Sequence, residues 1–286
     1  MIALPRSGAV LAAVLATSCG ATLRTLPQGP GAPAADLAIV LEEATAACRR
    51  VSTLTAEVAI SGSVNGQRVR GRVLTGLAAP SSVFLDAAAP FGASFFQYAA
   101  RGAQATLLLP RDARVLTDGD PVAVLDAVAG VPLGAADLRA AMTGCTLDST
   151  GVASRAGRQY GAEWRVAASD RSESYLHRDS SNGPWRVVAV RRSERGFGWR
   201  ADYTDFEGGL PRTIRLASDD RRRFNLKLTL SQVEVDAPLE DAVFELTIPA
   251  SATPISIDEL RRSGPFGSPG SARSTTPPQG GERRAG

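Results

Sequence analysis

The chain has 286 residues, of which 44% are hydrophobic, and this excludes a globally disordered protein because a sizeable core can form. The formal net charge is +3, contributed by Arg6 and by residues 263–286, so that residues 19–262 are close to neutral. A nucleic-acid surface needs basic residues clustered on one face of the fold. The composition therefore predicts no nucleic-acid partner.

The first predicted element is an export signal over residues 1–18. It has a basic start at Arg6 and then a small, apolar stretch over residues 8–16. That stretch is shorter than the about 20 residues of a membrane span but is typical of a secretory signal peptide. It ends at Thr17-Ser18-Cys19, which is similar to a bacterial lipoprotein processing site. We expect Cys19 to be lipidated; the alternative is an ordinary signal peptide that contains a cysteine.

Two elements follow before the first strand. Residues 19–35 are rich in Gly, Pro and Ala and are predicted to be a flexible tether. Residues 36–51 carry apolar side chains at helical spacing, with charged side chains between them. This pattern predicts an amphipathic helix.

From residue 54 the apolar period changes to two, which indicates strands. Asn65-Gly66 is a two-residue hairpin signal, and the returning strand has Val69 and Val73 on one face and three arginines on the other. Further strands are predicted at 82–88, 94–99, 104–109, 113–117, 146–153, 160–168, 173–178, 185–192, 198–206, 211–217, 222–235 and 243–248. Between them, residues 121–143 predict a short helix that begins at Pro121 and a second helix over 134–143. Residues 263–286 are rich in Gly, Pro and Ser and are expected to be disordered.

These elements predict a mainly β domain over residues 36–262. About ten or eleven antiparallel strands form a sheet that must curl or close, with an N-terminal helix and a short helical lid. An incompletely filled interior of this kind would bind an apolar ligand, whereas the alternative is a packed β core with no cavity. The predicted cavity residues are Val58, Ile60, Val73, Trp199, Tyr203, Leu226, Leu228 and Leu230.

Cysteine and histidine usage restricts the chemistry of the chain. Cys48 and Cys145 remain if Cys19 is acylated, and in an exported protein they either form a disulfide or stay separate buried thiols. His177 is the single histidine. The sequence has no nucleophile elbow of the G-x-S-x-G type and no phosphate-binding glycine loop. We therefore predict no catalytic residues, no metal, no cofactor and no enzymatic activity.

Five motifs, in this order, resemble the lipoprotein-localisation family that includes LolA and LolB. They are the lipoprotein-type signal with its tether and helix; the strand pair at 53–76; "VFLDAAAPFGASFFQYA" at 83–99; "LDAVAGVPLGAADLRAAMTG" at 125–144; and the run at 203–261. The resemblance implies an unclosed β-barrel with a helical lid. It also implies a cavity that takes the acyl chains of lipoproteins in transit.

The resemblance further implies a membrane-contact loop at Pro90, Phe91 and Gly92, where Phe91 takes the place of a protruding apolar residue. The alternative is that Phe91 packs under the lid. The implied partners are acylated lipoproteins or another lipid, the membrane through the anchor, and a periplasmic LolA-like carrier. The implied location is the outer membrane, facing the periplasm. Two other functions stay open: a structural envelope lipoprotein without lipid cargo, and a carrier of other lipids on the same fold.

Overall fold

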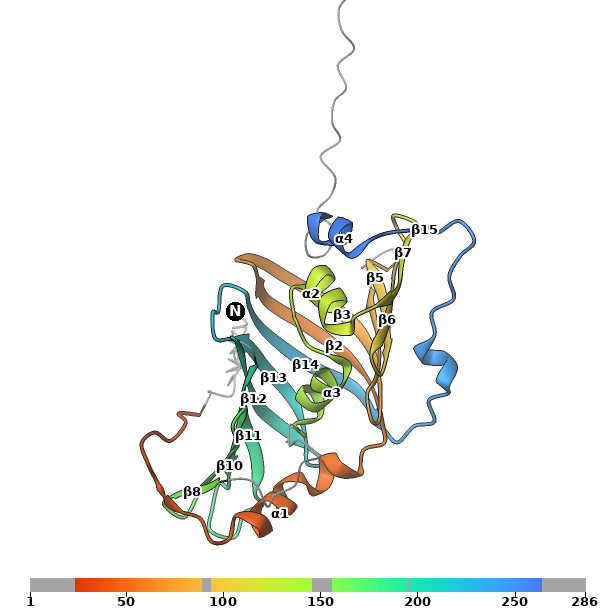
Figure 1. The fold of residues 1–286 in the computed structure, drawn as a ribbon. Coiled ribbons are helices and arrows are strands. Elements are labelled where there is room, and N and C mark those ends of the chain that lie inside the picture. Colours follow the sequence, from red (N-terminus) through yellow and green to blue (C-terminus); the bar gives the residue numbers. More distant parts are fainter. Residues whose placement is uncertain (1–23, 89–93, 146–155, 195, 264–286) are drawn as a thin grey trace, which may run out of the picture.

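The computed structural model describes residues 24–88, 94–145, 156–194 and 196–263 (Figure 1). The predicted signal peptide, Cys19, the loop residues Pro90, Phe91 and Gly92, and the strand at 146–153 lie outside these ranges. In the described residues, a long curved sheet partly surrounds two short helices (Figure 1).

Of the four α-helices in the described ranges, three were predicted, each within two residues of its ends. They are α1 (Leu37–Arg50), α2 (Pro121–Ala129) and α3 (Ala135–Thr143); α4 (Ile257–Ser263) was not predicted. The α2 helix begins where the Asp120 side chain accepts a hydrogen bond from the Ala123 backbone N–H, a standard N-cap. It ends at Gly130 with a φ of 68°, and α3 ends at Gly144 with a φ of 74°. Glycine adopts this left-handed conformation at little cost.

The strands make one sheet in the described residues, in the order β1-β8-β9-β10-β11-β12-β13-β14-β2-β3-β4-β5-β6-β7-β15. Their bounds are β1 (Ala32–Pro33), β2 (Thr53–Val64), β3 (Gln67–Ala78), β4 (Ser82–Ala88), β5 (Phe96–Arg101), β6 (Gln104–Leu109), β7 (Arg114–Gly119), β8 (Ala156–Tyr160), β9 (Trp164–Ala168), β10 (Ser172–His177), β11 (Arg186–Glu194), β12 (Phe197–Glu207), β13 (Leu210–Ser218), β14 (Phe224–Val235) and β15 (Thr253–Pro254). The sheet does not close on itself, which confirms the predicted open, barrel-like class.

The pairing of β14 with β2 joins the two halves of the sheet. It places Leu228 opposite Ile60 and Leu230 opposite Val58. Residues opposite one another in an antiparallel pair share a face, so these side chains lie on the face toward α2 and α3, which we call the inner face. The β2–β3 hairpin turns at Asn65 and Gly66, with φ values of 49° and 76°, as predicted for a turn that needs positive φ.

Two predicted strands are wrong. The segment 160–168 is not one strand, because a turn at residues 161–163 separates β8 from β9 and Gly161 has a φ of 61°. The segment 243–248 is not a strand: it begins inside a 3-10 helix, η2 (Asp241–Phe244), and continues irregularly. The split hairpin and the two-residue strands β1 and β15 also raise the strand count of the described residues to fifteen, above the ten or eleven expected.

Residues 24–35, the second part of the predicted tether, lie against one edge of the sheet. β1 pairs with β8, and the Tyr160 hydroxyl donates a hydrogen bond to the Gly29 carbonyl oxygen at 2.7 Å. Leu26 packs on a small apolar cluster that contains Val166 and Tyr175. In the part of the chain that the structure describes, no helix has the length and apolarity needed to cross a bilayer.

Candidate functional site

An apolar cavity of about 90 Å³ lies between the inner face of the sheet and the two lid helices, α2 and α3. Its lining comes from β2, β3, β4, β5, β13 and β14 on one side and from α2, α3 and their link on the other. The lining residues are Val58, Ile60, Val73, Thr75, Leu85, Phe96, Leu125, Ala129, Val131, Leu138, Met142, Leu216, Leu226 and Leu228.

Five of the eight predicted cavity residues meet in this lining: Val58, Ile60, Val73, Leu226 and Leu228. The other three, Trp199, Tyr203 and Leu230, are buried in the core without lining the cavity. The lid helices cover only part of the inner face, so an inward-pointing side chain need not line the cavity.

The sequence analysis predicted a lid but named no lid residue. Leu125 and Ala129 on α2, and Leu138 and Met142 on α3, contribute to the cavity lining. Each pair has a spacing of four residues, which places both side chains on one helix face. This spacing is the signal in the sequence that could have identified them.

Thr75 is the one lining residue with a polar side chain. It is 5% exposed, and its hydroxyl oxygen has no hydrogen-bond partner among the described residues. None of the lining residues is ionisable. The cavity therefore offers broad apolar contact and a single unpaired hydroxyl, which suits an apolar ligand.

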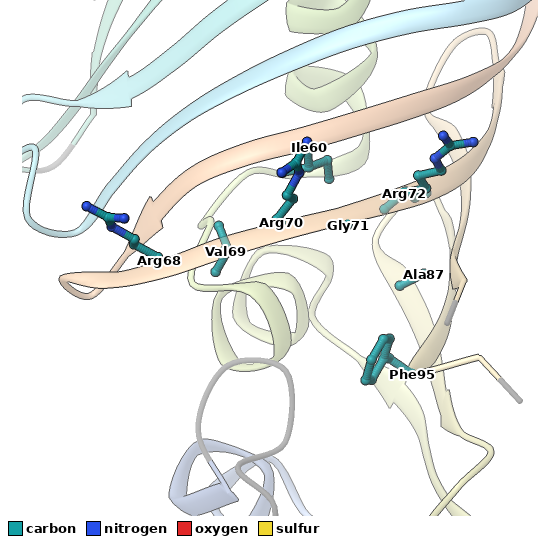
Figure 2. A pocket seen from close by; sticks show the side chains of 9 residues that line it. Ile60, Arg68, Val69, Arg70, Gly71, Arg72, Ala87 and Phe95 are labelled. Carbon is teal, nitrogen blue, oxygen red and sulfur yellow. The ribbon is translucent and has the colours of Figure 1, made fainter. Parts of the chain in front are cut away.

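A second hollow of about 200 Å³ adjoins the cavity at the edge of β3 and shares Ile60 and Val73 with it. We call it the edge groove (Figure 2); its lining is Ile60, Arg68, Val69, Arg70, Gly71, Arg72, Val73, Ala87 and Phe95. β4 pairs with β3 only from Arg72 onward. In the described residues, the start of β3 thus has a free edge, and the groove lies beside it.

Alternation along β3 separates the two sides of the edge groove. Arg68, Arg70 and Arg72 project away from the side on which Val69 and Phe95 lie (Figure 2). Phe95 is 38% exposed, and the Arg111 guanidinium lies 4.0 Å from the centroid of its ring. Phe95 was not predicted as a site residue. Successive positions of this segment are apolar in the sequence, so the alternation does not show which side chains face inward.

Ion pairs hold the lid helices to the sheet. Asp126 of α2 pairs with Arg223 at 3.0 Å, and Asp137 of α3 pairs with Arg192 at 2.5 Å. The Tyr98 hydroxyl also donates a hydrogen bond to the carbonyl oxygen of Pro121, at the start of α2. Burial raises the pKa of Tyr98, so this hydroxyl keeps its proton at neutral pH.

Cys48 and Cys145 form a disulfide, with their Cα atoms 5.5 Å apart. The bond joins the end of α1 to the residue that follows the α3 C-cap, 97 positions further along the chain. It therefore anchors one end of the lid to the N-terminal helix.

His177 lies outside the cavity lining, with its ring centroid 4.3 Å from that of Trp164. Burial, and next the positive charge of Arg24, hold the pKa of His177 below its ordinary value, while Asp179 and Glu163 act in the opposite direction. In the described ranges, no group of three or more His, Cys, Asp or Glu side chains is arranged to hold a metal ion.

These features define a class of protein with an open, mainly antiparallel sheet and a helical lid over an apolar cavity. No family model and no curated protein matches the chain. Among solved structures, a DUF1329 family protein from Desulfovibrio piger is 12% identical and has a TM-score of 0.49, covering 73% of this chain and 97% of that chain.

Two further structures have the same coverage and a TM-score of 0.46. One is a putative outer membrane lipoprotein-sorting protein domain from Vibrio parahaemolyticus, at 10% identity. The other is a LolA superfamily protein from Nitrosomonas europaea, at 12% identity.

Proposed function

We propose that the chain binds the acyl chains of a lipid or an acylated protein in the cavity under α2 and α3. The observation that carries this proposal is a cavity lined by thirteen apolar side chains and Thr75, which shares Ile60 and Val73 with the edge groove. Each buried methylene contributes about 0.8 kcal/mol. An acyl chain would therefore gain its binding free energy from the apolar surface that it buries, and no catalytic group is needed.

Binding requires the lid to move. Ligand pockets have volumes of about 300–1,000 Å³, and the cavity has about 90 Å³. The Asp126–Arg223 pair is about one-third exposed on each side, and exposed ion pairs contribute only about 0–1 kcal/mol. This ion pair therefore opposes opening only weakly. Most of the cost of moving α2 comes from its buried apolar side chains Val124, Leu125 and Val128, which a bound acyl chain would cover again, while the disulfide retains the end of α3.

The finer proposal is that the chain is an envelope lipoprotein that accepts acylated lipoproteins and helps to insert them into the outer membrane. The Cys19 motif and the order of the five family-like motifs support it. The apolar lining supports a binding protein rather than an enzyme, since it holds no nucleophile activated by a base.

The decisive test fills the cavity without introducing a charge. Ala129→Leu adds three carbon atoms to the α2 face of the cavity, and Ala46→Leu makes the same change on an exposed position of α1. We expect the full chain to bind a fluorescent fatty acid. Ala129→Leu should weaken that binding by at least about tenfold, which corresponds to about 1.4 kcal/mol, and Ala46→Leu should leave it unchanged.

Three outcomes separate the competing functions. Absence of fatty-acid binding in the unmodified chain would favour a structural envelope protein without lipid cargo. Binding without transfer of an acylated protein to liposomes would favour a carrier of other lipids. Binding together with transfer, both lost in Ala129→Leu, would support the lipoprotein-delivery function.

A further inference from the structure

A polar pocket of about 240 Å³ lies on the outer face of the sheet, opposite the inner face that carries the apolar cavity. Its lining is Arg191, Arg200, Asp202, Arg215, Ala217, Ser218, Asp219, Arg221 and Asn225. Four arginines thus face two aspartates. We call it the arginine pocket, and its residues come from β11, β12, β13, β14 and the turn after β13.

Strand register assembles the arginine pocket with like charges opposite one another. Arg191 of β11 lies opposite Arg200 of β12, and Arg215 of β13 lies opposite Lys227 of β14. Like charges directly opposite in a sheet are destabilising. Two such pairs on neighbouring strands concentrate positive charge on this part of the outer face, which a bound anion would offset.

The carboxylates near the arginine pocket balance only part of its charge. Asp202 lies opposite Arg215, but both of its oxygens accept hydrogen bonds from Arg200, at 3.0 and 2.9 Å. Glu173 lies opposite Arg191 and is hydrogen-bonded by Tyr175 and Arg158.

Asp219, the second aspartate of the pocket, packs on Gly198, where an added Cβ would come within 1.9 Å of its carboxylate. No described carboxylate lies within 4.0 Å of the Arg191, Arg215 or Arg221 guanidinium groups. Three arginines therefore remain able to donate to one anion.

We propose that the arginine pocket binds the phosphate group of an anionic phospholipid headgroup. Guanidinium groups donate two parallel hydrogen bonds to phosphate oxygens. The pocket volume of about 240 Å³ is many times the about 10–15 Å³ that one water needs, so that a phosphate group fits.

The position of the pocket favours a membrane lipid over free phosphate. Lys227 lies opposite Ser61, which lies opposite Arg70 on β3. Adjacent strands are about 4.8 Å apart, so basic side chains continue across the outer face from the arginine pocket to Arg68 and Arg70 at the edge groove. A bilayer surface contacting this band would also lie beside the edge groove, which shares Ile60 and Val73 with the apolar cavity.

The test measures binding to vesicles. The full chain carries Cys19→Ala, which removes the predicted anchor, and is mixed with vesicles of phosphatidylcholine alone or of phosphatidylcholine with phosphatidylglycerol. Arg215→Gln/Arg221→Gln removes two pocket arginines, and Arg49→Gln/Arg262→Gln removes two exposed arginines elsewhere. Both pairs change the net charge equally.

We expect stronger binding to the anionic vesicles and a loss of about fivefold for each pocket arginine removed, with less than about a twofold change in the control pair. Equal losses in both double variants, or no preference for anionic vesicles, would overturn the proposal. Glycerol phosphate that binds as tightly as the vesicles would assign the pocket to soluble phosphate and overturn the membrane assignment. Ala129→Leu should leave this vesicle preference intact, which separates it from acyl binding.

Discussion

Thr75 places a hydroxyl group among the apolar side chains of the cavity. Its oxygen is buried without a hydrogen-bond partner among the described residues, and an unpaired buried polar group costs about 1–3 kcal/mol. A carbonyl group of a lipid ester would satisfy it. Under the proposed function, Thr75 would thus link the stability of the ligand-free protein to the chemistry of the ligand.

We predict that Thr75→Val raises the unfolding free energy of the ligand-free protein by about 1 kcal/mol, because it removes the unpaired hydroxyl while keeping the shape of the side chain. Urea denaturation measures the change. The control is Thr229→Val on an exposed position of β14, expected to stay within about 0.5 kcal/mol. A destabilised Thr75→Val would mean that the hydroxyl has a partner.

His177 makes stability depend on pH. Its pKa is lowered from 6.5 in the folded protein, chiefly by burial, so the unfolded chain binds more protons below that pH. We predict that the unfolding free energy falls as the pH drops through about 6.5, and that the contribution is complete above it.

Denaturation curves between about pH 5 and pH 7.5 test this prediction. His177→Phe keeps an aromatic ring beside Trp164 and should flatten the curve in that range. An unchanged pH dependence in this variant would assign the effect to other groups.

At the scale of elements, the disulfide between α1 and the end of α3 closes a loop of 97 residues. We predict that Cys48→Ala/Cys145→Ala lowers the unfolding free energy by up to about 4.7 kcal/mol, since cross-linking so long a loop removes much entropy from the unfolded chain. Denaturation with and without reductant measures the loss. The reduced unmodified chain should resemble the double variant, and a disulfide-independent stability would contradict the prediction.

Residues 243–248 differ from the strand that their local sequence pattern predicts. Residues 243–248 alternate like a strand, yet Phe244 ends a 3-10 helix and is buried. Just before it, Leu239 and Val243 lie 3.8 Å from the position that a Cβ on Gly76 would take, on the outer face of β3. A short apolar run is compatible with a strand or with another packed segment. Here the segment packs on the outer face of β3 at Gly76 and forms a 3-10 helix instead of pairing as a strand.

At the scale of the whole molecule, a ligand that binds only the folded state stabilises it by mass action. We predict that a long-chain fatty acid at 100 times its dissociation constant raises the unfolding free energy by about 2.7 kcal/mol. Thermal unfolding with increasing ligand measures the effect. At the same ligand concentration, Ala129→Leu should gain less, and an equal gain would place the ligand outside the cavity.

The sequence by itself determined the local elements. Period-two alternation, the Asn65-Gly66 turn, Pro121 at the start of α2 and the glycines after α2 and α3 depend on neighbouring residues only, because backbone preference and side-chain direction are local properties. The same alternation also predicted the inward face of β2, β3 and β14, and with it five of the cavity residues.

Only the tertiary structure decided which strands become neighbours and which inward-facing side chains line the cavity. The pairing of Leu228 with Ile60 joins strands more than 160 positions apart, and no local pattern encodes which strands become neighbours. For this reason Trp199, Tyr203 and Leu230 could be predicted as inward-pointing but not excluded from the cavity lining. The arginine pocket has the same origin: Arg191, Arg200 and Arg215 are scattered in sequence, and strand register brings them together.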